Sequence, residues 1–221
     1  MNLQSSSLKF LKDLEKNNNR EWFQSHKTQF DLTAQNLKAV TEDIKKGLNQ
    51  KDVIEDAKIF RIYRDVRFSK DKSPYKNHLG VHFVRASRER RGGYYLHIEP
   101  GNCFAGGGFW EPNPEDLKRI RDEIAFDAKP LRKIISSKTF VKYFGTLGGD
   151  ELKTAPSGYE RDHPDIDLIR KKQFVVMRKF TDKDVLDTGF SKEVVRTFEA
   201  MRPFFDYMSE VLTTDLNGQN R

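Results

Sequence analysis

Apolar residues in the first fifty positions recur at helical spacing. Leu8, Leu11 and Leu14 follow the serines at 5–7, which predicts a helix that ends in the asparagines at 17–19. From Arg20 onward, the spacing predicts one further long helix that forms a hairpin with the first. The expected buried face of the second helix consists of Phe23, Phe30, Ala34, Leu37, Val40, Ile44 and Leu48.

The middle of the chain changes to short segments rich in β-branched and aromatic residues. Residues 58–65, 79–85, 94–99 and 102–109 have this composition and are separated by Gly, Pro or Ser clusters, which predicts four strands. Because most connections are too short for a crossover helix, neighbouring strands should be antiparallel. Residues 173–180 predict a later strand in the same sheet. The glycines at 106–108 predict a bend or bulge rather than a phosphate-binding loop.

The second half of the chain adds further helices. Asn113, Pro114 and the acidic residues that follow predict a helix start, and Ile120 and Ile124 belong to its buried face with Leu117. Residues 145–164 are rich in Gly and Pro and predict a loop, whereas residues 191–212 predict a last helix, kinked at Pro203. The predicted fold class is α+β. We expect a single domain over residues 1–221, with an antiparallel-dominated sheet flanked by N-terminal and C-terminal helices.

Composition excludes several classes of protein. The 221 residues are 36% hydrophobic and 12% aromatic, which is typical of a folded chain rather than a disordered one. A single cysteine, Cys103, excludes an intrachain disulfide and a cysteine-based zinc site. No apolar run approaches about 20 residues, and the N-terminus lacks the order of a secretory signal. We therefore expect a cytoplasmic protein with no membrane partner.

The positive charge is concentrated in one segment. The chain has 40 Lys and Arg against 33 Asp and Glu, a net charge of +7. Residues 61–91 contain 10 basic and 3 acidic residues, so this segment alone accounts for 10 − 3 = +7 and the rest balances at 30 of each sign. Such a segment is either a solvated surface or a binding site for an anionic partner.

Strand alternation predicts that polar side chains gather on one face of the sheet. Residues two apart on a strand share a face. If the polar faces of three strands coincide, they carry Arg61, Tyr63, Asp65, Arg67, His82, Tyr95, His97 and Glu99. An exposed face of an antiparallel sheet explains the alternation without any ligand. It explains less well why His, Arg and Tyr are present rather than Thr, Lys and Glu.

The segment at 61–75, RIYRDVRFSKDKSPY, is a specific motif, and we call it the signature segment. Its diagnostic positions are Arg61, Arg64, Asp65, Arg67, Phe68, Asp71, Lys72 and Tyr75. With this segment, the chain resembles the uncharacterised bacterial and fungal proteins catalogued as domain of unknown function 2461. Supporting matches are residues 19–23, NREWF, and the Gly-rich residues 101–112. The resemblance covers nearly the whole chain and implies membership only, because no activity is established for that family.

The residue types in the signature segment suit an anion. Arginine presents a planar fork of donors to phosphate or carboxylate oxygens, and lysine adds a mobile charge. We expect Asp65 to orient one guanidinium group. The expected ligand-binding residues are Arg61, Arg64, Arg67, Lys72 and Tyr75. A purely structural network of Arg and Asp side chains is an equal alternative.

Histidines and carboxylates on the sheet allow two other kinds of chemistry. His82, His97 and Glu99 form a possible two-histidine, one-carboxylate metal site, although the spacing is not diagnostic. Asp65, His97 and Glu99 are the candidates for general acid or base catalysis. The sequence identifies no cofactor and leaves open whether the protein is an enzyme.

Three functions are consistent with these patterns. The first is binding of a phosphorylated or otherwise anionic small ligand. The second is a nucleic-acid-binding module in which phosphate contacts are combined with stacking on Tyr63, Phe68, Tyr75 and Phe83. The third is a scaffold or interaction protein whose motif is structural.

Overall fold

The computed structural model describes residues 1–67, 70–87 and 89–219, and over these residues it confirms the predicted α+β class. Its elements in chain order are α1 (Ser5–Lys16), α2 (Arg20–Ser25), α3 (Lys27–Leu48), β1 (Ile54–Ile59), β2 (Leu79–Arg85), β3 (Gly93–Ile98), β4 (Cys103–Phe109), α4 (Pro114–Phe126), α5 (Lys129–Ile135), α6 (Lys138–Phe144), α7 (Ile166–Ile169), β5 (Phe174–Phe180), α8 (Asp182–Leu186) and α9 (Phe190–Thr213). Every helix among these residues is too short or too polar to span a bilayer.

The internal contacts of the chain divide it into two compact units. Unit 1 contains Met1–Val84, Tyr95–Ala105 and Lys179–Arg196, and unit 2 contains Arg85–Tyr94, Gly106–Arg178 and Thr197–Arg221. Neither unit is one continuous stretch, because β2, β3, β4, β5 and α9 each contribute residues to both. The expectation of a single domain over residues 1–221 stays a prediction.

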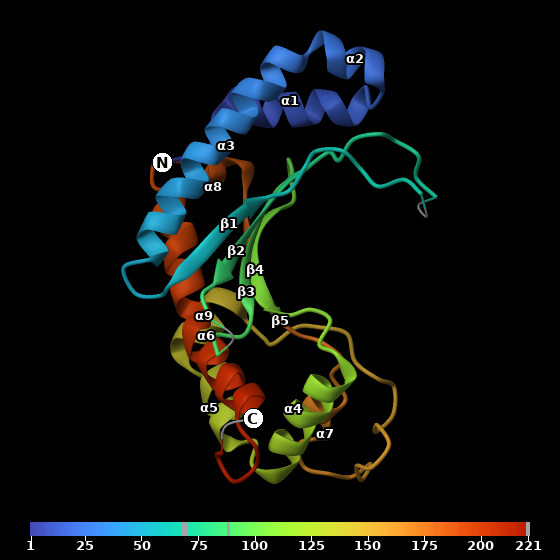
Figure 1. Cartoon of the computed structure of the whole chain (residues 1–221), viewed down its shortest axis with the longest axis vertical. Helices are drawn as coiled ribbons and strands as arrows, with labels where there is room; N and C mark the ends of the chain where they lie inside the picture. The colour runs from blue at the N-terminus through green and yellow to red at the C-terminus, as the bar shows by residue number, and fades with distance from the viewer. Residues whose placement is uncertain (68–69, 88, 220–221) are drawn as a thin grey trace. The chain divides into compact units, whose positions relative to one another are not determined.

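The strands form one antiparallel sheet in the order β1-β2-β3-β4-β5 (Figure 1). Spatial order follows chain order, because short turns join β2 to β3 and β3 to β4. The strand β5 lies next to β4 although four helices separate them in the chain. This position confirms the prediction that residues 173–180 return to the sheet.

The N-terminal helices follow the predicted pattern with one difference. Leu8, Leu11 and Leu14 are buried on α1, which contacts α3. The single long helix predicted after Arg20 is wrong at His26, where α2 ends and α3 begins. The His26 ring stacks on Trp22 at 4.0 Å, and its Nδ1 lies 2.8 Å from the Trp22 carbonyl oxygen. The backbone of His26 leaves helical geometry, with φ −110 and ψ 16, and this break separates the two helices.

The first predicted strand is displaced along the chain. The structure places β1 at Ile54–Ile59 rather than at 58–65, and only Ile54 of that strand is buried. After Phe60 the chain pairs with itself: Arg64 N donates to Pro74 O at 2.9 Å, and Tyr63 forms an isolated bridge with Tyr75. These backbone groups therefore find their partners inside the signature segment. The predicted common strand face of Arg61, Tyr63, Asp65 and Arg67 is accordingly wrong.

Aromatic side chains form much of the core of unit 2. Tyr94 is fully buried, with its ring centroid 4.9 Å from Phe198 and 5.1 Å from Phe205 on α9. Phe109 on β4 meets Phe204 and Phe205 edge-on. Each such ring contributes about 1.5–3 kcal/mol by burial. This packing gives α9, where the sequence predicts a helix over residues 191–212, a buried apolar face.

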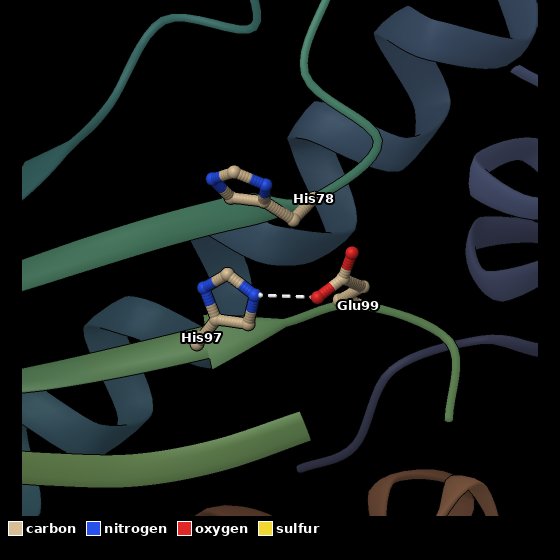
Figure 2. A group of neighbouring side chains, drawn as sticks. All are labelled: His78, His97 and Glu99. Carbon is tan, nitrogen blue, oxygen red and sulfur yellow. Dashed lines mark hydrogen bonds and ion pairs between the residues drawn. The ribbon is translucent and has the colours of Figure 1, made fainter. Parts of the chain in front are cut away.

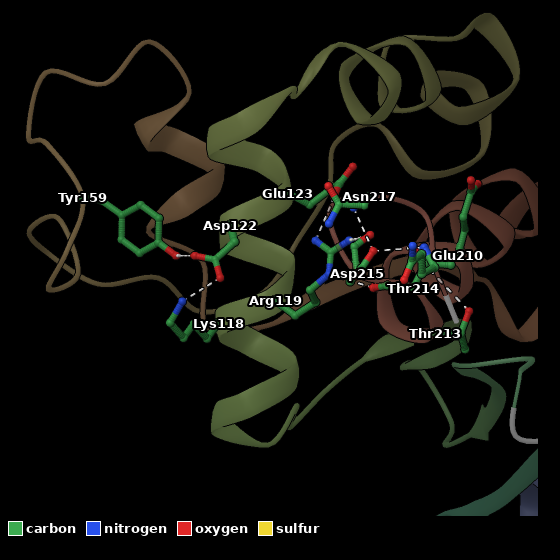
Figure 3. A network of polar contacts seen from close by, with 11 residues as sticks. Lys118, Arg119, Asp122, Glu123, Tyr159, Glu210, Thr213, Thr214, Asp215 and Asn217 are labelled. Atoms are coloured by element: carbon green, nitrogen blue, oxygen red, sulfur yellow. Dashed lines mark hydrogen bonds and ion pairs between the residues drawn. The ribbon is translucent and has the colours of Figure 1, made fainter. Parts of the chain in front are cut away.

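The helix α4 begins where the sequence predicts, and it is tied to two loops of unit 2. Asn113 accepts a hydrogen bond from Asp116 N at 2.8 Å, which caps the helix. On one side of α4, the buried Arg119 donates to the backbone oxygens of Thr214 and Asp215 after α9 (Figure 3). On the other side, Tyr159 OH donates to Asp122 at 2.8 Å and anchors the predicted loop at 145–164 (Figure 3).

Part of the basic segment serves the fold of unit 2. The Arg85 side chain is only 2% exposed and donates to Asp206 Oδ1 at 2.7 Å and to Arg91 O at 3.0 Å. Arg91 in turn pairs with Asp116. Arg85 is buried whereas Asp206 is half exposed, and the two pairings attach this part of the basic segment to α9 and α4.

A glycine of β4 is required by a close backbone approach. Gly108 has φ +130, and a Cβ atom there would lie 2.2 Å from the Phe174 carbonyl oxygen on β5. We expect Gly108→Ala to lower the free energy of unfolding by about 3 kcal/mol or more, because the sheet would have to shift. Gly158→Ala is the matched control: Gly158 has φ +88 but open space around it, so we expect a loss of about 1 kcal/mol. Urea unfolding measures both, and equal losses would contradict the prediction.

A carboxylate fixes the turn between β3 and β4 within unit 1. Asp182 Oδ1 accepts from Gly101 N at 2.7 Å, and Oδ2 lies 2.9 Å from Lys12 Nζ. The hydrogen bond from Gly101, followed by the one from Lys12, lowers the pKa of Asp182 below its ordinary value of 3.8. A lowered carboxyl pKa stabilises the folded state above the unfolded pKa, and this stability is lost as the pH falls through the folded value.

The pH dependence of this turn is testable with one variant. We expect Asp182→Asn to lower the free energy of unfolding by about 1–2 kcal/mol at pH 7. The difference from wild type should shrink as the pH falls below 3.8 and through the lower pKa of the folded carboxyl group, since the wild-type carboxylate is then protonated. Urea unfolding at pH 7 and below pH 3 measures it. Asp162→Asn, at an exposed position of unit 2, is the control and should change stability by less than about 0.5 kcal/mol. A pH-independent difference would refute this account.

Candidate functional site

Two strands of unit 1 present a polar face. On β2, Leu79, Val81 and Phe83 are buried, so the alternate positions occupy the opposite face. On β3, Leu96 and Ile98 are likewise buried. Alternation places the side chains of His78, His82, Tyr95 and His97 opposite these apolar residues, and Gly80 lies on the same face. Contacts among their rings support this arrangement: the centroids of His78 and His97 lie 4.4 Å apart.

His97 is held from several sides. Its Nδ1 lies 3.2 Å from Tyr95 OH, and its Nε2 lies 3.1 Å from Glu99 Oε2 (Figure 2). The Phe104 ring stacks on the imidazole at 4.7 Å. His97 is therefore buried with both ring nitrogens in polar contacts, and its orientation is fixed.

Glu99 lies just after β3 and accepts hydrogen bonds on both oxygens. Asn77 donates to Oε1 at 2.8 Å, and Asn102 donates to Oε2 at 2.7 Å. Burial raises the pKa of Glu99, but the hydrogen bonds from Asn102 and His97 outweigh that effect, so its pKa lies below the ordinary value. The carboxylate is thus ionised at neutral pH.

His78 immediately precedes β2 and lies beside His97 (Figure 2). Burial is the largest cause that lowers the pKa of His78, to about 4, and the nearby His97 acts in the same direction. Glu99 opposes these effects, while Lys76 and Arg64 add to them. His78 is consequently a neutral imidazole at physiological pH.

Gly80 gives Tyr95 its position. A Cβ atom at Gly80 would lie 2.6 Å from Tyr95 OH and 3.2 Å from the Phe60 ring. Only a residue without a side chain leaves room for the hydroxyl group there. Gly80 therefore allows Tyr95 to reach His97, and the alternation pattern alone does not reveal this role.

Most of the expected anion clamp is occupied within the signature segment. Arg64 pairs with Asp71, and Arg67 donates from Nε and Nη2 to Asp65 at 3.0 and 2.6 Å. The side-chain hydrogen bond from Arg67 lowers the pKa of Asp65 well below its ordinary value. Asp65 thus orients Arg67, as predicted from the sequence.

Two further predicted ligand-binding residues, Lys72 and Tyr75, also have internal partners. Lys72 donates to Val66 O at 3.0 Å. Tyr75 is buried and stacks on Phe23 at 4.0 Å. Because Tyr75 and Phe83 are buried, the prediction that they stack on bases is wrong, whereas Tyr63 is 48% exposed. Phe68 lies outside the described residues.

A smaller group of cations remains beside the histidines. Burial, followed by the charges of Arg61 and Arg64, lowers the pKa of Lys76. Lys76 Nζ donates to Arg61 O at 3.1 Å, and Arg61 is exposed. Over the described parts of the chain, no carboxylate pairs with the side chain of Arg61 or Lys76. We call Arg61, Arg64 and Lys76 the cationic group.

The structure thus brings together only some of the predicted site residues. His97 and Glu99 meet as strand alternation predicts, but the second histidine beside them is His78, whereas the charged groups near His82 are Lys58 and Asp56. The predicted patterns also miss Lys76, Asn77, Gly80 and Asn102. Extending the alternation of β2 back from Gly80 by two residues would have found His78.

Two surface cavities of unit 2, of about 470 and 370 Å³, contain none of these residues. The larger of the two is lined by residues that include Trp110, Phe144 and Gln173.

Comparison with known proteins identifies a family but no function. No curated protein and no solved structure matches the chain. The model of a family described as conserved hypothetical protein, DUF2461, matches residues 6–207. This match includes the helical hairpin, the signature segment, the sheet and most of α9, so the chain belongs to the DUF2461 family.

Proposed function

We propose that this protein binds a small anionic ligand, such as a phosphate ester or a carboxylate, at the cationic group beside His78. The observation that carries the proposal is the convergence of Arg61, Arg64 and Lys76, since like charges repel unless something compensates them. An anion at this place would supply the missing negative charge.

Arg64 supports this proposal by its incomplete hydrogen bonding. It pairs with Asp71 through Nη1, but its buried Nε has no hydrogen-bond partner among the described residues. An unsatisfied buried donor costs about 1–3 kcal/mol. A small movement of the side chain would let this donor meet a ligand oxygen and recover that cost.

The position of the cationic group also suits a reactive or specific site. Lys76 and Arg64 act electrostatically on His78, which lies against His97. An anion held by these cations therefore has an imidazole and a carboxylate nearby, which are the common groups for proton transfer. Lys72, Arg67 and Tyr75 have a supporting role in this proposal, because Lys72 and Arg67 are engaged within the loop and the Tyr75 ring stacks on Phe23 of α2.

A second candidate function is binding of single-stranded nucleic acid. Phe60 is 37% exposed and Tyr63 is 48% exposed, and Lys58 and Lys76 lie over the Phe60 ring at 5.9 and 5.7 Å. Exposed rings beside lysines resemble the stacking surfaces of single-strand binders. These two exposed rings, Phe60 and Tyr63, offer fewer stacking positions than the four rings expected from the sequence.

Titration with inorganic phosphate, pyrophosphate and a 20-nucleotide oligothymidylate tests both candidates. At low salt, we expect phosphate or pyrophosphate to raise the melting temperature of the wild-type protein, because a ligand of the folded state stabilises it. Lys76→Gln and Arg61→Gln should each weaken this binding by about tenfold, or about 1.4 kcal/mol. Lys133→Gln removes the same charge at an exposed position of α5 and should leave affinity unchanged.

Three outcomes are decisive. Equal affinities of the three variants would show that only net charge matters and would overturn the proposed site. Absence of small-anion binding together with oligothymidylate binding that falls steeply with salt would favour the nucleic-acid function. Absence of both would leave the signature segment with a structural role.

A further inference from the structure

We infer that His78, His97 and Glu99 bind a divalent first-row transition-metal ion. The inference stands apart from the proposed anion site, because it rests on a different set of atoms. One potential ligand atom from each residue lies within 4.8 Å of the other two. Two imidazoles and one carboxylate are the donor set of many zinc and non-haem iron sites.

The distances are compatible with an ion among the three side chains. Bonds to such an ion are about 2.0–2.2 Å, so two ligand atoms of a tetrahedral site lie about 3.3–3.6 Å apart. His97 Nε2 and Glu99 Oε2, at 3.1 Å, are already close to this spacing. The ligand atom of the half-buried His78 would have to move closer by up to about 1.5 Å, which a side-chain rotation supplies.

The surrounding hydrogen bonds have the form expected around a metal. Ligating histidines usually engage their second ring nitrogen with another polar group, which fixes the direction of the first. Here Tyr95 OH contacts His97 Nδ1 and leaves Nε2 toward Glu99. Asn77 and Asn102 hold the carboxylate from two different chain segments.

The donor set leaves room for a further ligand on the ion. Three protein ligands leave at least one coordination position for water or an anion. The neighbouring cationic group would favour an anion at this open coordination position. One anion would then contact both the metal ion and the cationic group.

Zinc and cobalt titrations of untagged, EDTA-treated protein test the inference. We expect isothermal titration calorimetry to give one Zn²⁺ per chain, and we expect Co²⁺ to produce visible absorption bands. His78→Gln and Glu99→Gln should weaken Zn²⁺ binding by about 100-fold, and Tyr95→Phe by about 10-fold through loss of the His97 contact. The control is His82→Gln, which removes a histidine of β2 outside the group and should leave affinity unchanged.

Circular dichroism and urea unfolding of the metal-free variants separate metal loss from misfolding. His78 is only half-buried, so His78→Gln should fold and serves as the primary variant. No Zn²⁺ binding by wild type, or equal affinity in His78→Gln and His82→Gln, would overturn the inference. Phosphate titration of the metal-free wild type keeps the proposals distinct: Zn²⁺ binding without phosphate binding would overturn only the anion site.

Discussion

Burial of one apolar face of the sheet is the constraint on which the candidate site depends. Four side chains on this face are fully buried in the core: Val81 and Phe83 on β2, and Leu96 and Ile98 on β3. Because side chains alternate along a strand, packing these residues inward directs His78, Gly80, Tyr95 and His97 to the opposite face. A shift of one residue in either strand would exchange the two faces and bury the polar set in the core. The register is therefore fixed by hydrophobic burial, and the arrangement of the site follows from it.

The same face carries an energetic cost that ordinary surface residues would avoid. A buried imidazole and a half-buried carboxylate lose hydration, and the hydrogen bond between them, together with those from neighbouring polar groups, offsets the loss. Glu99 is held by Asn77 before β2 and by Asn102 after β3, so it joins two segments far apart in the chain. Such a network stiffens this end of the sheet. It also fixes the directions of the nitrogen and oxygen atoms, which is what a binding site requires.

The sequence predicts the parts of this structure that repeat a simple pattern. The positions of α1, α4, α9 and β2 to β5 follow from hydrophobic spacing and capping residues, and the meeting of His97 with Glu99 follows from strand alternation. It does not predict the path of residues 60–76, because Tyr63 and Tyr75 have strand-like side chains but pair within a loop. His78 was missed for a related reason: it precedes the apolar run that marks β2. The helices α5 and α6 have seven residues each, too few for a periodic face to stand out.

The pairings within the signature segment explain how such a basic loop can fold beside two histidines. Two of its arginines form ion pairs within the segment, Arg64 with Asp71 and Arg67 with Asp65, which reduces the repulsion among its positive charges. Tyr75 stacks on Phe23 and attaches the loop to the helical hairpin of unit 1. With these contacts made, the loop holds Lys76 and Asn77 in place, and the next residue is His78. The paired residues of the motif therefore stabilise the loop. Its Arg61 places positive charge next to Lys76, near the histidines. A structural network and the proposed ligand site are therefore compatible within one segment.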